Sequence, residues 1–268
     1  MSGELKNRDV RNGDSPHFQM DLLGGEVGDE NGDSPRSPRI RVSRRARRLS
    51  VRVYPDARVE VVVPARARAR EVQHFIAEHR QWIDDKRAAA LRRRPAPEPF
   101  PPANLHFAAT RESWRLHLAG GAGRLRIAEV ESAGDRILSV SGRLTPAELR
   151  VALRAWLVRA AQARLTPRVA ALAQTVGTRF ARVSIRRQRS RWGSCSVRGT
   201  ISLNACLLFH RPEVVDYLIV HELSHVRHMN HSVRFWQAVE QHCPGWRALD
   251  RELVEGWRHV PRWAFHED

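Results

Sequence analysis

The chain has 268 residues, 42% of them hydrophobic and 28% charged, which is typical of a globular protein with room for a sizeable core. No stretch approaches the roughly 20 apolar residues that a membrane helix needs, so the composition excludes a membrane-spanning protein. The net charge of +17, from 46 Lys and Arg against 29 Asp and Glu, favours a polyanionic partner such as nucleic acid.

The basic charge has a second explanation. Only Lys6 and Lys86 are lysines, so nearly all of the positive charge is arginine. Together with abundant Ala, Val and Pro, this is also typical of an amino-acid usage that is skewed across a whole proteome. A nucleic-acid-binding surface and a skewed usage therefore both remain open.

The cysteines and the first residues bear on the compartment. Cys195, Cys206 and Cys243 form no CxxC pair and are too few for a disulfide framework, so we expect reduced thiols. The opening residues, MSGELKNRDV, lack the apolar core of a signal peptide. We therefore expect a cytoplasmic protein.

The first predicted segment is a disordered tail over residues 1–38. It contains Gly, Asp, Ser, Pro and Asn with little apolar periodicity, and NGDSP occurs at 12–16 and again at 31–35. Such a composition cannot bury enough apolar surface to fold.

Residues 39–142 are predicted to form a small β-rich region with one helix. Alternating valines at 51–53 and 59–63 around Pro55-Asp56 indicate a hairpin. Apolar residues at three-to-four spacing then predict a helix over 67–93, followed by a proline-rich linker at 95–102. Glycine-separated strands are expected at 112–118, 124–130 and 136–140.

Residues 143–268 are predicted to form a second domain. Thr145, Pro146 and Glu148 form a helix-start pattern, and we expect that helix to run towards Gly177 with a break near Pro167. Strands are expected in ARVSIRRQ and TISLNACLLF, and helices from His210 onward and over 232–242 and 246–257.

The segment VHELSHVRHMNHS carries the chemistry. His221 and His225 lie four residues apart in an apolar helix, so both imidazoles project from one face and can converge on one ion. Glu222, beside the first histidine, is placed to accept a proton from a metal-activated water.

A hydrolytic metal site usually has a third protein ligand and one open position. His228 lies seven residues from His221, about 10.5 Å along a continuous helix, which is too far for three imidazoles to surround one ion. His231 follows Asn230, and asparagine tolerates the left-handed backbone conformation that ends helices. If the helix stops near Asn230, His231 can turn back to the metal. The spacing matches that of metzincin proteases, with His228 where those have glycine. We rank His231 first, above Glu240 and Glu252.

Residues 40–258 resemble the YgjP-like metallopeptidase family, relatives of the SprT/Spartan zincins. The resemblance is carried by Trp192-Gly193-Ser194-Cys195, Leu203-Asn204, the HELSH helix, and Asn230-His231-Ser232 followed by Phe235-Trp236. It implies one Zn²⁺ per chain, held by the HExxH histidines and the third histidine, and a hydrolase activity. The expected fold is α+β, with a zincin-like catalytic domain over 143–268 in which the HExxH helix packs on a small sheet.

The loop before the active-site helix supplies the candidate substrate-binding residues. A strand in this position often pairs with an extended peptide, and Gly193 permits close backbone approach. Arg189 and Arg191 can hold an anionic group or a developing oxyanion; the alternative is that Trp192 belongs to the core and the arginines are solvated. The candidates are Arg189, Arg191, Trp192, Gly193 and Ser194.

Three functions compete. The first is a zinc peptidase acting on peptides or proteins, with Glu222 as general base. The second is a metal-dependent nucleotide phosphohydrolase of the pyrophosphatase type, favoured by six arginines and no acids in 182–198. The third is a non-catalytic nucleic-acid-binding protein with structural zinc, which the placement of Glu222 beside His221 disfavours.

Overall fold

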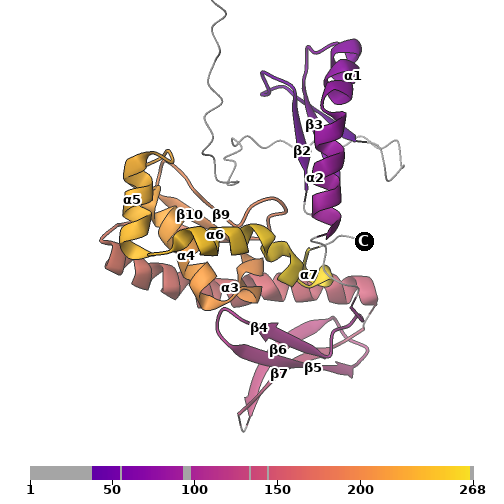
Figure 1. Cartoon of the computed structure of the whole chain (residues 1–268). Helices are drawn as coiled ribbons and strands as arrows, with labels where there is room; N and C mark the ends of the chain where they lie inside the picture. Colours follow the sequence, from indigo (N-terminus) through magenta and orange to yellow (C-terminus); the bar gives the residue numbers. More distant parts are fainter. Residues whose placement is uncertain (1–37, 55, 93–97, 133, 144, 266–268) are drawn as a thin grey trace, which may run out of the picture.

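The computed structural model describes residues 38–265 except 55, 93–97, 133 and 144. The predicted tail therefore lies outside the described residues apart from residue 38, as does Pro55 of the predicted turn. The fold is α+β, with three small sheets and helices distributed between them (Figure 1). Within the described residues, no helix combines the length and the apolar character needed to cross a bilayer.

A small N-terminal module contains the first sheet. Its order is β1-β3-β2, and the predicted hairpin is confirmed, because β2 pairs antiparallel with β3. Val61, Val63 and Val72 form its small core. The single helix expected over 67–93 is wrong: the helical phase breaks at His79, and two helices form instead. The elements are β1 (Arg39–Ser43), β2 (Ser50–Val53), β3 (Val59–Pro64), α1 (Ala69–Glu78) and α2 (Arg80–Arg92).

A four-stranded sheet follows, in the order β4-β5-β7-β6. The three predicted strands are confirmed, and the short strand β4 is an addition to them. Leu105, Trp114 and Leu138 are buried from this sheet into the main core of the molecule. Residues 39–142 thus contain two separate sheets, of which the second packs on α3. Its strands are β4 (Asn104–Phe107), β5 (Glu112–Gly120), β6 (Arg126–Ser132) and β7 (Asp135–Ser141).

The long helix α3 (Pro146–Val176) lies between this sheet and the C-terminal part of the chain (Figure 1). It begins with the predicted cap, in which the Glu148 backbone N–H donates to Thr145 Oγ1 at 3.2 Å. The break expected near Pro167 is wrong, because the helix continues to its left-handed cap at Gly177. An internal proline costs about 3 kcal/mol, but Leu165 and Val169 on either side of it are fully buried, and their burial offsets that cost.

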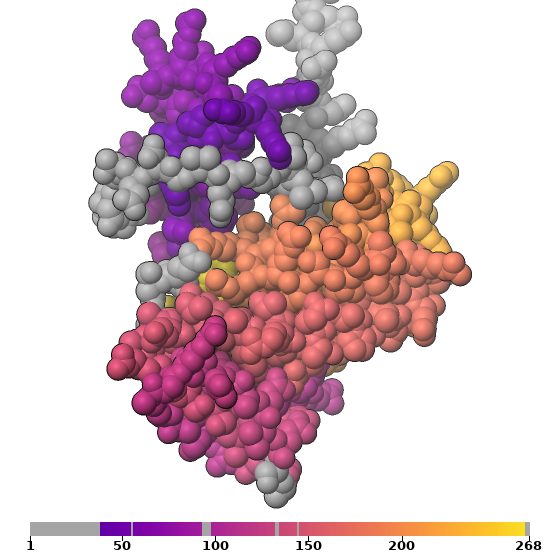
Figure 2. Space-filling model, turned by 180° about the vertical axis from the view of Figure 1, so that it is seen from behind, coloured from indigo at the N-terminus to yellow at the C-terminus, as the bar shows by residue number. Residues whose placement is uncertain are grey.

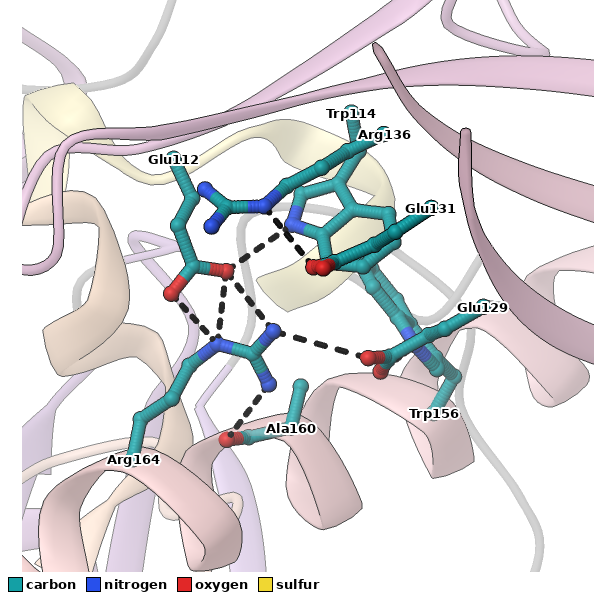
Figure 3. Close-up of polar contacts among 8 residues, drawn as sticks. All are labelled: Glu112, Trp114, Glu129, Glu131, Arg136, Trp156, Ala160 and Arg164. Atoms are coloured by element: carbon teal, nitrogen blue, oxygen red, sulfur yellow. Dashed lines mark hydrogen bonds and ion pairs between the residues drawn. The ribbon is translucent and has the colours of Figure 1, made fainter. Parts of the chain in front are cut away.

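A partly buried ion-pair network joins the second sheet to α3 (Figure 3). Arg164 Nε and Nη2 donate to the Glu112 carboxylate at 2.8 and 2.7 Å, and Nη2 lies 3.5 Å from Glu129. Trp114 Nε1 donates to Glu112, and Trp156 Nε1 donates to Glu129. Each carboxylate thus accepts a hydrogen bond from an indole and forms an ion pair with the same guanidinium, which fixes the position of the sheet on the helix.

The C-terminal part contains the third sheet and the helices around it. The sheet order is β8-β10-β9, with β9 antiparallel to β10 at one edge. Arg168 of α3 donates to Asp216 of α4 at 2.8 Å, which connects the long helix to the HExxH helix. The elements are β8 (Arg182–Arg186), β9 (Gly193–Cys195), β10 (Thr200–Asn204), the 3₁₀ helix η1 (Ala205–Phe209), α4 (Pro212–Ser224), α5 (Val233–His242), α6 (Trp246–Glu255), the 3₁₀ helix η2 (Gly256–His259) and α7 (Arg262–Phe265).

Candidate metal centre

The HExxH sequence lies at the end of α4, a helix that is buried on nearly all sides. Pro212 opens it at a position where the missing N–H costs nothing, and every residue from Tyr217 to Ser224 is buried. His221 and His225 are 4% and 6% exposed. Histidines on a solvent-facing helix surface would be exposed. The burial of His221 and His225 is instead typical of metal-binding histidines.

The structure brings His221, His225 and His231 together. Their potential ligand atoms all lie within 4.8 Å of one another, and His221 Nε2 is 3.2 Å from His231 Nε2. Two neutral imidazoles can form one N–H···N hydrogen bond with each other. Three imidazoles whose nitrogens converge on one point are better explained by a metal ion that all three bind. The donor set therefore fits a divalent transition metal with nitrogen ligands.

The chain reaches His231 by a turn that begins earlier than expected. The helix was expected to stop near Asn230, but α4 ends at Ser224, and the His228 N–H donates to the Ser224 carbonyl at 3.0 Å. His225 Nδ1 lies 3.1 Å from the His228 carbonyl oxygen, and a proton on Nδ1 leaves Nε2 as the ligand atom. His228 thus contributes its backbone to the site, and its imidazole is not part of the convergent group.

Helix α5 supplies an aromatic wall behind the imidazoles. The Phe235 ring, fully buried, lies 4.5 Å from the ring of His225 and 4.8 Å from that of His231. Trp236 stacks on His231 with 5.4 Å between ring centroids, and on Trp246 of α6 with 4.0 Å. These contacts restrict the rotation of the imidazoles and exclude water from one side of the site.

Glu222 points towards β9. Its side chain is 4% exposed, and Gly193 lies so close that a Cβ built there would meet Glu222 Oε1 at 2.5 Å. Burial raises the pKa of the Glu222 carboxyl to about 8, and the positive charge of Arg191 opposes this rise. The Glu222 carboxylate thus lies between the HExxH helix and an edge strand, in a nearly water-free environment.

The loop before β9 is held by Asn204, which the resemblance includes without a role. Asn204 is fully buried, and its Nδ2 donates to the Gln188 and Arg191 carbonyls at 2.8 and 2.9 Å. Its Oδ1 accepts from the Cys206 N–H, and its own N–H donates to the Trp192 carbonyl. Sequence reasoning missed this residue, although a lone Asn at the end of an apolar strand was its signal.

The five candidate substrate-binding residues occupy different environments. Trp192 is 4% exposed and stacks on Trp257 with 4.0 Å between centroids, so it supports the loop from the core. Gly193 and Ser194 belong to β9 and are half-buried, as are Arg189 and Arg191. The other acidic ligand candidates are engaged elsewhere: Glu252 accepts from Arg211, and Glu240 pairs with Arg247.

Tyr217 and Asp250 form a buried polar pair beside the centre. The Tyr217 hydroxyl donates to Asp250 Oδ1 at 2.7 Å, and its ring lies 5.9 Å from that of His221. Burial, followed by the charge of Asp250, raises the pKa of Tyr217 above its ordinary value, so the phenol stays protonated and keeps donating.

Comparisons with known proteins identify a family and a similar solved structure. A family model described as the YgjP-like metallopeptidase domain matches residues 47–255, more than half of the chain. Among solved structures, the chain is similar to the metallopeptidase zymogen abylysin of Pyrococcus abyssi, with 27% identity over 35% of this chain and 95% of that chain and a TM-score of 0.31. No curated protein matches the sequence.

Proposed function

The chain belongs to the YgjP-like metallopeptidase family, and from this premise we propose that it is a zinc-dependent peptidase that hydrolyses peptide bonds. One observation carries the proposal: three convergent imidazoles lie beside a buried carboxylate that packs against an edge strand. His221, His225 and His231 would hold one zinc ion, and Glu222 would be the general base.

The donor set suits zinc. Zinc binds imidazole nitrogen at about 2.0–2.1 Å, so two ligands of a tetrahedral site lie roughly 3.3–3.4 Å apart. The 3.2 Å between His221 Nε2 and His231 Nε2 is close to that value. Three protein ligands leave one coordination position for water or substrate, as in catalytic sites. A structural site would be closed and would have no need of a buried Glu222 beside it.

Glu222 would carry out both proton transfers of the reaction. When bound, zinc lowers the pKa of a coordinated water and polarises the substrate carbonyl. Glu222 accepts the proton of the attacking water and returns it to the leaving amine. Burial favours the second step, because it disfavours the charged carboxylate and so makes protonated Glu222 more readily formed, whereas the positive charge of a bound metal would favour the carboxylate needed for the first step.

The edge strand β9 favours a peptide substrate. Only one of its sides pairs with β10, so its other edge is free of sheet partners among the described strands. An extended peptide can add to such an edge through backbone hydrogen bonds, which would place its carbonyl groups beside Gly193 and Glu222. Arg191, whose charge acts on Glu222, is the candidate partner for a substrate carboxylate or oxyanion.

A product assay separates the peptidase from the phosphohydrolase. The purified full chain is incubated with a quenched fluorescent peptide library and, separately, with nucleoside triphosphates. We expect new amino termini from the peptides, abolished by Glu222→Gln while the zinc content stays at about one per chain. Release of phosphate or pyrophosphate with no peptide cleavage would replace the proposal with the nucleotide hydrolase. Cleavage that survives Glu222→Gln would remove the role of general base.

A further inference from the structure

The N-terminal module carries an excess of positive charge that the metal centre does not use. Residues 38–92 contain fifteen Arg and Lys against six Asp and Glu, which accounts for nine of the seventeen net positive charges of the chain. These 55 residues are about a fifth of the sequence, so a uniform enrichment in arginine does not explain the distribution.

The topology of the sheet gathers part of this charge at one end. Strand β1 runs parallel to β3, and Ser43 pairs with Pro64, so both strands end on the same side of the sheet. Because β1 and β2 flank β3, the connection over 44–49 must cross that end, where the connection from β3 to α1 also begins. Seven exposed arginines therefore gather there: Arg44, Arg45, Arg47 and Arg48 from the first connection, Arg66 and Arg68 from the second, and Arg70 from the first turn of α1.

The residues among these arginines carry no negative charge. The residues between the arginines are Ala46, Ala67 and Ala69, and neither 44–49 nor 65–70 contains an acid. Glu71 follows directly, but its carboxylate accepts from the Arg68 backbone N–H in the first turn of α1. Leu49 and Ala67 turn inward and pack against the small core of the module. The residues of 44–49 and 65–70 thus form a cationic surface that exposes no large apolar side chain, and the nearest exposed ones are Ile40 and Val42 of β1.

The position of this surface suits a large ligand. The module projects from the body, and α1 lies at its end far from α3 (Figure 1). Viewed from behind, long side chains of the module stand out into solvent at that end (Figure 2). A polyanion bound there would not have to enter the metal site.

We propose that the seven-arginine end of the N-terminal module is a docking surface for the phosphate backbone of nucleic acid. Planar guanidinium groups match phosphate oxygens two at a time, and arginine is the residue most often used for this contact. The surface has no Asn, Gln or aromatic side chain between its arginines to read bases, so binding is independent of base sequence. A membrane surface fits less well, because alanines supply no apolar side chain that can insert among lipids.

Binding of the full chain to a fluorescent 20-base-pair duplex at several salt concentrations tests the proposal. If most of the seven arginines contact phosphates, the logarithm of the association constant falls with the logarithm of salt concentration with a slope of roughly −4 to −6. A patch variant replaces Arg44, Arg47, Arg48 and Arg66 with Gln. A control variant removes the same charge from exposed positions of the catalytic part, by replacing Arg159, Arg179, Arg182 and Arg198 with Gln.

We expect the patch variant to lose at least about tenfold in affinity near 0.1 M salt and to show a shallower slope, whereas the control variant loses less than about threefold. Equal losses in the two variants would mean that the total charge, and no defined surface, binds the duplex. Wild-type affinity that does not depend on salt would also overturn the proposal. So would patch-dependent binding to phosphatidylserine vesicles without binding to the duplex. Unchanged circular dichroism and zinc content show that each variant is folded.

Discussion

Gly193 and Glu222 lie in direct contact, and the missing side chain of the glycine makes the space that the carboxylate fills. A Cβ at residue 193 would stand 2.5 Å from Glu222 Oε1 and 2.9 Å from its Cγ. Neither partner can easily move away, because Glu222 is buried in α4 and Gly193 is paired with Leu203 in the sheet. The strand and the general base are therefore positioned by one another.

Gly193→Ala is expected to reduce turnover while leaving the metal in place. The added methyl group pushes the carboxylate away from the attacking water, and a misplacement of about 1 Å can cost on the order of 10²-fold in rate. Zinc content should stay at the wild-type value, because the three atoms nearest to an added Cβ all belong to Glu222 and none to a histidine. Peptide cleavage and elemental analysis measure the two effects, and full activity in the variant would show that Glu222 does not act from this position.

His231→Ala is expected to remove most of the metal, and His228→Ala is its matched control. His231 Nε2 belongs to the convergent group, whereas His228 contributes a backbone carbonyl that alanine retains. Elemental analysis of protein purified without added metal should therefore show about one zinc per chain in the wild type and the control, and far less in His231→Ala. Equal metal content in the two variants would point to another third ligand.

The parts of this molecule that could be predicted from sequence are those with local causes. Three elements follow from residues that are close together in the sequence: the cap at Thr145, the hairpin of β2 and β3, and the HExxH helix. The break at Pro167 was wrong, since local propensity was outweighed by the burial of Leu165 and Val169, which depends on the whole core.

The site divides in the same way. Spacing alone indicates that His221 and His225 share a face, and a helix end is enough to suggest His231. The contact of Gly193 with Glu222 and the hydrogen bonds from Asn204 to the Gln188, Arg191 and Trp192 carbonyls join segments that meet only in the folded sheet, so no local pattern identifies these partners. The convergence of the arginines likewise required the strand order of the first sheet.

Asn204→Asp is expected to release the loop before β9. The substitution keeps the size and the acceptor for the Cys206 N–H, but it replaces Nδ2, which donates both hydrogen bonds, with one carboxylate oxygen that faces the Gln188 and Arg191 carbonyls. We expect a loss of about 2–4 kcal/mol in the free energy of unfolding and a lower kcat with unchanged zinc content. If stability falls but kcat at a temperature where the variant is folded does not, Asn204 supports the fold without positioning the catalytic strand.

Arg164→Met is expected to destabilise the contact between the second sheet and α3. Its guanidinium and the Glu112 carboxylate are only 15% and 13% exposed, so removing the cation leaves a nearly buried carboxylate without its charged partner. The expected cost is about 2–4 kcal/mol. Arg136→Met is the control, because the Arg136–Glu131 pair is exposed and is worth less than about 1 kcal/mol. Urea unfolding measures both, and similar losses in the two variants would contradict the difference in burial.

The stability of the protein is expected to fall in mild acid because of His210. This imidazole is 2% exposed under Gly256, and burial, followed by the charge of His259, lowers its pKa to about 3. Above pH 6.5 the side chain is neutral in both the folded and the unfolded state, so it makes no pH-dependent contribution there. Below pH 6.5 the unfolded chain takes up a proton that the folded state accepts only near pH 3, so the free energy of unfolding decreases by about 1.4 kcal/mol per pH unit.

The loss between pH 6.5 and 5.0 should therefore be about 2 kcal/mol larger in the wild type than in His210→Gln, which carries no titratable group at this position. Urea unfolding of both proteins in the presence of a chelator isolates this difference, because protonation of the metal ligands then affects the two proteins equally. An identical pH dependence would show that His210 is protonated in the folded state, or that the loop beneath Gly256 opens to water. Protonation of His210 in the folded state is disfavoured by its surroundings. Its ring lies in close contact with the backbone at Gly256, where an added Cβ would overlap it. Opening of the loop would also expose Trp192, so the difference in tryptophan fluorescence between the wild type and Trp192→Phe during acidification distinguishes the two outcomes.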